Sequence, residues 1–196
     1  YILLLLSLFS CERENSLLEP GNARIYMPAA VKGIYNVPLA GTTLAAKNFS
    51  IDSVSRKVNI PLSVYISGRQ QSSAFTVKTA INADTVLALS KVNMLQGAAV
   101  FPVAACTAPA QVTVAEGNQH ADFQVAIDMD TLWKYEGGKI AFAVSISEPS
   151  AYELNDNITT AVIVMEVDPV LYGPLLTLTS NYIKNAGPIF NITQDS

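Results

Sequence analysis

The distribution of hydrophobic positions along the chain predicts β-strands over most of its length. In KVNIPLSVYIS, residues 57–67, every second position is hydrophobic, and Asn59, Ser63 and Tyr65 occupy outward positions between them. A period of two is typical of a strand with one buried face. Strand patterns also occur at 24–30, 47–52, 74–81, 98–105, 110–117, 120–128, 139–148 and 158–168. The strands follow one another with turns between them, which predicts an all-β antiparallel sandwich rather than a parallel sheet.

One segment has a helical pattern long enough to predict a helix. In Asp84–Asn93 the side chains of Val86, Leu89 and Val92 share one face, and Asp84 is the expected N-terminal cap. Residues 130–138, DTLWKYEGG, predict a single helical turn that begins at Asp130 and ends in a glycine turn. We therefore expect one short helix inserted into the sandwich.

The first eleven residues differ from the rest of the chain. The hydrophobic run at 1–9 is too short to cross a bilayer, which takes roughly 20 residues, but it fits the apolar part of a secretory signal. Leu8-Phe9-Ser10-Cys11 resembles the bacterial lipobox, and the resemblance implies that Cys11 is lipidated. An ordinary N-terminal strand is the alternative.

These patterns divide the chain into four parts. Residues 1–11 are expected to be a lipoprotein signal peptide ending at the lipidated cysteine, and 12–23 a flexible tether containing Pro20-Gly21. Residues 24–168 form the sandwich. The tail, 169–196, is either a final hairpin or the start of a second domain.

Composition narrows the class of protein. Half of the 196 residues are hydrophobic and 14% are charged, so one domain with a substantial core is expected. The net charge is −4 and no basic stripe occurs, which argues against nucleic acid as a partner. If Cys11 is lipidated, Cys106 in an apolar segment is expected to be a buried, unreactive thiol. A Cys11–Cys106 disulfide is the alternative.

Three consecutive segments carry a resemblance to a known family: VTVAEGNQHADFQVAID, DMDTLWKYEGGKIAFAVSIS and AYELNDNITTAVIVMEVD. In this order they resemble the immunoglobulin-like N-terminal domain of Bacteroidota surface lipoproteins, a domain of unknown function. The resemblance covers residues 25–168. It implies an immunoglobulin-like sandwich, lipid-anchored in the outer membrane and facing the cell exterior. It also implies polysaccharides or oligosaccharides, and other surface uptake proteins, as partners.

The sequence offers little for catalysis. The chain has one histidine, His120, in the predicted turn GNQHAD, and no Gly-x-Ser-x-Gly, His-Glu-x-x-His or phosphate-binding glycine motif. One histidine and two cysteines argue against a zinc site. Asp122, Asp128 and Asp130 could chelate calcium at a strand end, and the alternative is that Asp130 caps the following turn. We expect no enzyme activity, cofactor or metal.

Exposed aromatic rings are the expected means of binding sugar, because a ring buries apolar surface at low entropy cost. The candidates are Trp133, Tyr135 and Tyr35, and the alternative for each is packing at the sandwich edge. Tyr152 falls where the resemblance implies a structural role.

Three tripeptides, beginning at Asp52, Asp84 and Asp130, resemble the O-glycosylation signal of exported Bacteroidota proteins. They nominate Ser53, Thr85 and Thr131 as acceptors.

The sequence therefore predicts a non-catalytic cell-surface lipoprotein that binds or scaffolds extracellular glycans for a polysaccharide-uptake system. The alternative is a structural or adhesin-type module with a protein partner. Two exposed rings beside a groove would favour sugar, whereas a long unpaired apolar edge strand would favour protein pairing.

Overall fold

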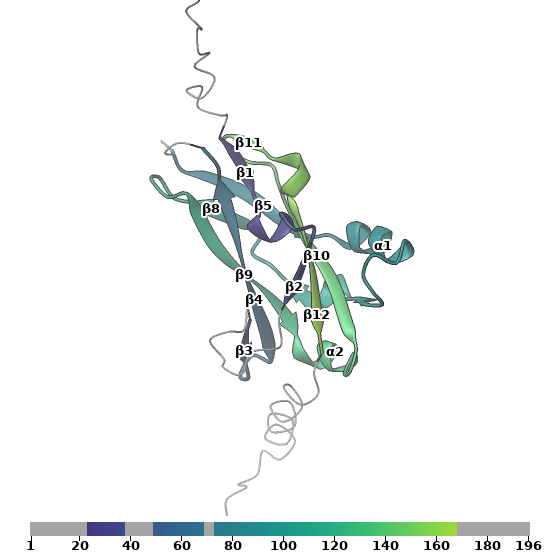
Figure 1. Ribbon diagram of the computed structural model, residues 1–196. Helices are drawn as coiled ribbons and strands as arrows, with labels where there is room; N and C mark the ends of the chain where they lie inside the picture. The colour runs from purple at the N-terminus through teal and green to yellow at the C-terminus, as the bar shows by residue number, and fades with distance from the viewer. Residues whose placement is uncertain (1–22, 38–48, 69–72, 168–196) are drawn as a thin grey trace, which may run out of the picture.

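The computed structural model describes residues 23–37, 49–68 and 73–167, which form two β-sheets packed on one another (Figure 1). This confirms the predicted all-β sandwich. The predicted signal peptide with Cys11, nearly all of the tether and the tail at 169–196 lie outside the described residues.

Sheet A contains the longest ladder among the described residues. Its strands lie in the order β11 (Glu153–Leu154), β1 (Arg24–Tyr26), β4 (Lys57–Ile66), β9 (His120–Asp128) and β7 (Cys106–Thr107), and β3 (Ser50–Asp52) also pairs with β4. The antiparallel pairing of β4 and β9 runs from Lys57 opposite Asp128 to Tyr65 opposite His120.

Sheet B is the second layer. Its strands lie in the order β2 (Ile34–Val37), β12 (Thr160–Glu166), β10 (Lys139–Ser147), β5 (Phe75–Ile81) and β8 (Gln111–Val114), and β6 (Ala99–Val100) also pairs with β10. Short 3-10 turns occur at Pro28–Ala30 (η1), Val103–Ala105 (η3) and Asp156–Ile158 (η4).

The long ladders are antiparallel, as predicted, but three short pairs are parallel: β1 with β11, β2 with β12 and β6 with β10. The partners in each pair are far apart in sequence. No hairpin turn therefore constrains their relative direction, and either direction of pairing is available. The sheets are mixed for this reason.

The alternation predicted for β4 matches its burial. The even-numbered side chains from Val58 to Ile66 are buried, and the odd-numbered ones lie on the outer face of sheet A. The buried, even-numbered side chains meet buried side chains of sheet B, such as Phe142 and Ile163, in one hydrophobic core between the sheets. Fully burying one such side chain contributes about 1.5–3 kcal/mol.

A nine-residue helix, α1 (Ala83–Lys91), covers part of the outer face of sheet B (Figure 1). Val86 and Leu95 pack there on Ala141, Ala143 and other side chains in a second hydrophobic cluster. The small alanines let the helix lie close to the sheet.

The predicted cap of α1 is wrong. Asn82, not Asp84, accepts a hydrogen bond from the Thr85 amide at 3.1 Å, because the helix begins one residue earlier than the pattern indicated. In the described ranges no helix is both long and apolar enough to cross a membrane.

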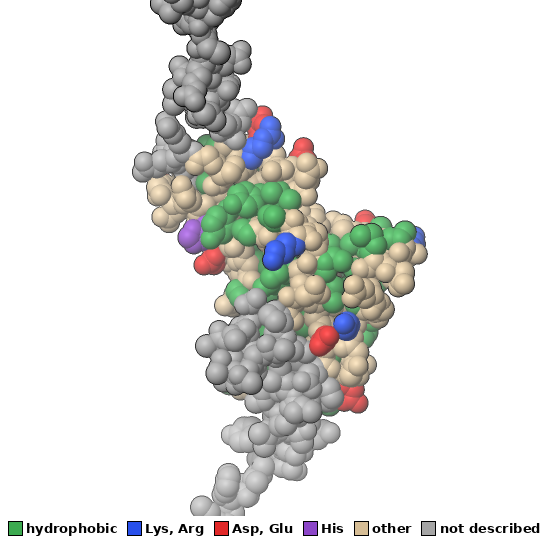
Figure 2. All heavy atoms as spheres, in the orientation of Figure 1, with side chains coloured by type: hydrophobic (Ala, Val, Ile, Leu, Met, Phe, Trp, Pro, Cys, Tyr) green, Lys and Arg blue, Asp and Glu red, His purple; other side chains and the backbone are tan. Residues whose placement is uncertain are grey.

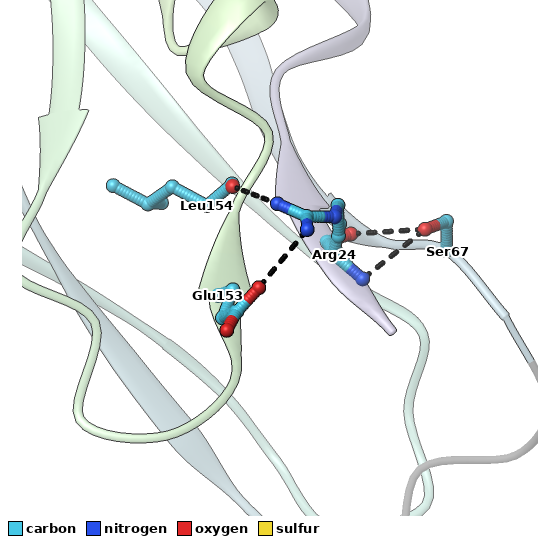
Figure 3. A network of polar contacts seen from close by, with 4 residues as sticks. All are labelled: Arg24, Ser67, Glu153 and Leu154. Atoms are coloured by element: carbon cyan, nitrogen blue, oxygen red, sulfur yellow. Dashed lines mark hydrogen bonds and ion pairs between the residues drawn. The ribbon is translucent and has the colours of Figure 1, made fainter. Parts of the chain in front are cut away.

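A polar network fixes the first strand to its neighbours (Figure 3). The Arg24 guanidinium donates to the Leu154 carbonyl at 3.2 Å and pairs with Glu153 at 3.1 Å, which links β1 to β11. On the other side of β1, the backbone of Arg24 exchanges hydrogen bonds of 3.2 Å with the Ser67 hydroxyl, just beyond β4.

Candidate functional site

Three neighbouring strands of sheet A place aromatic rings in one row on the outer face. Tyr26 of β1 lies opposite Tyr65 of β4, and Tyr65 lies opposite His120 of β9. The ring centroids of Tyr26 and Tyr65 are 6.0 Å apart, and those of Tyr65 and His120 are 4.8 Å apart and nearly parallel. In Figure 2 the only histidine borders a hydrophobic patch on this face. We call these three residues the aromatic row.

The ladder explains why Tyr65 and His120 approach so closely. The Ile66 amide donates to the Gln119 carbonyl at 3.0 Å, so Ile66 and Gln119 form a hydrogen-bonded pair. The neighbouring pair, Tyr65 and His120, is therefore a non-hydrogen-bonded pair, in which side chains lie closer together.

Polar side chains continue from the aromatic row along the same two strands. Ser63 lies opposite Asp122 in the next row, and Pro61 lies opposite Gln124 in the row after it. Together with Leu62 and Phe123 they line a shallow groove of about 410 Å³, which we call the outer groove. Asp122 and Gln124 are exposed, so a carboxylate and an amide are available beside the rings.

A second groove lies at the edge of β4. Strand β1 pairs with β4 only at Tyr65 and Ile66, and β3 pairs with it only at Lys57–Asn59. The intervening part of β4, residues 61–63, lines a groove of about 270 Å³ together with Pro28, Ala29, Lys32 and Tyr35. We call this the edge groove. Pro61 fits this place, because a proline in a strand is tolerated where its missing N–H faces an open edge.

The structure separates the three predicted ring candidates. Tyr35 lines the edge groove. Trp133 and Tyr135 follow one another around the end of α2 (Met129–Trp133), and both are half-buried against the core, with the Tyr135 ring 5.5 Å from that of Phe101. Their role in binding stays a prediction. Tyr152 packs edge-on against Phe75 at 5.5 Å, in the structural position expected of it.

Two of the three carboxylates considered for calcium have other partners. Asp128 caps α2 by accepting from the Thr131 amide at 2.8 Å, so the expectation that Asp130 is the cap is wrong. Asp130 instead accepts two hydrogen bonds from the Arg56 guanidinium. These bonds hold the pKa of Asp130 below its usual value. Within the described ranges, no three acidic, histidine or cysteine side chains are grouped so as to hold a metal ion.

The glycosylation candidates differ in accessibility. Ser53 is exposed in a turn that Asp52 stabilises by accepting from the Val54 and Ser55 amides at 3.0 Å, and Val54 is 93% exposed. Hydrogen bonds from Ser55 lower the pKa of Asp52. Thr85 and Thr131 are half-buried in first helical turns, where the next residues, Val86 and Leu132, belong to the buried core. The tripeptide at Ser53 is therefore the most accessible of the three predicted sites.

The residues of the aromatic row were not among the sequence-based candidates. The alternating pattern predicts Tyr65 on the outer face, and the strand predicted over 120–128 begins at His120, as β9 does, although neither residue was nominated for binding. The sequence does show that such a ring occupies an outward strand position. It does not show which of the distant strands pair, and only that pairing brings the three rings into one row.

No protein-family model and no curated protein sequence matches this chain. Solved structures do share its fold. A "putative carbohydrate binding protein" from Bacteroides ovatus superposes with a TM-score of 0.55 at 10% identity, over 74% of this chain and 37% of the other. A two-domain protein of unknown function from Bacteroides fragilis superposes with a TM-score of 0.50 at 10% identity, over 79% of this chain and 48% of the other. A protein of unknown function from Bacteroides ovatus superposes with a TM-score of 0.48 at 19% identity, over 73% of this chain and 43% of the other.

The chain spans less than half the length of these three structures. At such identities the likeness concerns the fold, an all-β domain found in Bacteroides proteins that include one described as carbohydrate-binding.

Proposed function

We propose that this domain is a non-catalytic carbohydrate-binding module and that the aromatic row with the outer groove is its binding surface. The observation that carries the proposal is the juxtaposition of Tyr65 and His120 with Asp122 and Gln124 on one exposed sheet face.

The chemistry of this face suits a saccharide. Aromatic rings accept the apolar C–H surface of a sugar ring, and the rings here are already held by their neighbours, so little side-chain entropy is lost on binding. The Asp122 carboxylate accepts hydrogen bonds from sugar hydroxyls, and the Gln124 amide and the Ser63 hydroxyl both donate and accept them. Shallow grooves of this kind suit a chain lying along the surface.

A non-catalytic role is supported by the placement of the nucleophilic and basic side chains. The His120 ring stacks on Tyr65, and the Cys106 thiol is free and buried. In the described part of the chain, neither side chain makes a hydrogen bond to an acid, a base or a nucleophile with which it could act.

The alternative, a structural or adhesin-type module, would favour a long exposed edge strand. The outermost strands of the two sheets are β11, β7, β2 and β8, and in the described ranges they are two to four residues long. This favours the sugar interpretation.

The proposed setting is the outer membrane, with the module facing the cell exterior on a lipid attached to Cys11 and serving a polysaccharide-uptake system. The lipobox resemblance and the family resemblance support it. Metabolic labelling with a fatty-acid analogue should mark the wild-type protein, and labelling that persists in Cys11→Ala would contradict the anchor.

Tyr65→Ala is expected to weaken glycan binding by about tenfold or more, because it removes the central ring of the row. Tyr65 is partly buried but lies on the outer face of sheet A, so its truncation leaves the core intact. The measurement is affinity electrophoresis and calorimetry against a panel of plant, microbial and host polysaccharides, beginning with those that bind the wild-type protein.

Two further variants make this test specific. Lys57→Ala changes the same face of β4 at the opposite end of the strand and should bind as the wild type does. Trp133→Ala tests the site predicted from the sequence, with the melting temperature checked because Trp133 packs on the core. Binding lost in Trp133→Ala and retained in Tyr65→Ala would move the site to α2. No binding to any polysaccharide would overturn the proposed function.

A further inference from the structure

The outer groove and the edge groove meet on β4. Pro61, Leu62 and Ser63 line both of them, the first with β9 and the second with η1, Lys32 and Tyr35. A chain-like ligand that lies in the outer groove can therefore continue across β4 into the edge groove without leaving the surface.

Backbone polarity in the edge groove follows from the ladder. In an antiparallel pair the N–H and C=O of one residue point to the same side, and successive residues alternate. The Ile66 amide points to β9, where it donates to Gln119, so the backbone groups of Ser63 point to the opposite side. No described strand pairs with β4 at Ser63 on that side. The Ser63 N–H is therefore a donor directed into the edge groove.

Lys32 supplies a second donor to the same groove. Its side chain is exposed, and it has no ion pair with any described residue, whereas Arg24, Arg56, Lys78 and Lys139 each pair with a carboxylate. An ammonium group and a backbone N–H that line one groove favour a group with several acceptor oxygens and a negative charge.

The two grooves have opposite polarity. Asp122 contributes a carboxylate to the outer groove, and Lys32 contributes an ammonium group to the edge groove. A ligand carrying negative charge is repelled at the first and attracted at the second. The charge distribution thus sets which part of a glycan lies where.

We propose that the edge groove is a subsite for an acidic sugar unit, a uronate or a sulfated sugar, whose anionic group is bound by Lys32 and the Ser63 amide while the adjoining neutral part lies on the aromatic row. This inference rests on the proposed function and specifies the ligand class of the same surface. Tyr35, a sequence-based candidate, provides the apolar wall of the subsite.

The test compares polymers that differ only in charge. Polygalacturonate is measured against its methyl ester, and the sulfated galactan κ-carrageenan, which carries no uronate, against its chemically desulfated form, by calorimetry at low and at physiological salt. We expect the wild-type protein to prefer the charged member of one pair, with an advantage that shrinks as salt is raised. The pair that shows the preference distinguishes carboxylate from sulfate.

Lys32→Gln should reduce binding of the preferred charged polymer by about threefold to fivefold and remove its salt dependence, with binding of the neutral partner unchanged. Lys91→Gln, an exposed lysine at the end of α1, is the matched control and should have no effect. Equal binding of charged and neutral polymers by the wild type, or an unchanged Lys32→Gln variant, would overturn the acidic subsite alone. Loss of all binding in Tyr65→Ala would still support the proposed function in that case.

Discussion

Cys106 is expected to react with thiol reagents about a thousandfold more slowly in the folded protein than in the unfolded chain at pH 8. Burial raises the pKa of the Cys106 thiol to about 12, from an ordinary value of 9.0. Only the thiolate is nucleophilic, and the higher pKa lowers the fraction of Cys106 that is thiolate at pH 8, so the reaction rate falls with that fraction. The measurement is the rate of reaction with a disulfide dye in a full-chain Cys11→Ser variant, with and without urea.

The same thiol makes a pH-dependent contribution to stability. Its pKa is higher in the folded than in the unfolded state, so this contribution is complete below about pH 9 and is lost as the pH rises toward 12. Cys106→Ala is the control, because it lacks this titration and should show a shallower fall in unfolding free energy above pH 9. Equal reaction rates with and without urea would show that Cys106 is accessible, in disagreement with its 8% exposure.

The burial of Cys106 is predictable from the apolar residues around it in the sequence. Most strands are predictable as well, because their hydrophobic pattern is also a property of the local sequence. The pattern at β4 predicted which side chains face the core, and the pattern at 139–148 predicted β10 within one residue. Short strands that lack a period of their own were not expected. Strands β2, β7 and β11 are two to four residues long and exist only through pairing with distant segments.

The helix caps show a second limit. Asn82 and Asp128 each stand two residues before the aspartate that the sequence favoured, and all four are good cap residues. Helix-capping propensity alone does not show which of these residues is the cap. The tertiary contacts select the cap, because Asn82 also donates a hydrogen bond to Ser145 of β10 at 3.0 Å and Asp130 accepts hydrogen bonds from Arg56.

The candidate site depends on non-local pairing. Tyr26, Tyr65 and His120 come from three separate strands, and their alignment is set by the register of β4 with β1 and β9. A one-residue change of register would move a ring to the opposite face. Pro61 was the clearest local signal of the edge groove, because a proline within an alternating strand indicates an open edge.

Phe142→Ala is expected to cause the largest loss of stability of the substitutions considered, about 3–5 kcal/mol in the free energy of unfolding. Phe142 is 2% exposed and lies on β10, which pairs along most of its length with β12 on one side and with β5 and β6 on the other. Truncating it leaves a cavity between the two sheets that neighbouring β-branched side chains cannot fill without moving the backbone. Since small domains are stable by only about 5–15 kcal/mol, much of the margin would be lost.

Urea unfolding followed by fluorescence and circular dichroism measures this loss as a lower transition midpoint at an unchanged slope. Leu87→Ala is the control, because Leu87 is 45% exposed on α1 and its truncation should change stability by only about 0.5 kcal/mol. A loss of less than about 1.5 kcal/mol in Phe142→Ala would mean that this ring is not enclosed between two sheets. The packing of sheet A on sheet B would then be wrong, and so would the outward placement of the aromatic row that follows from it.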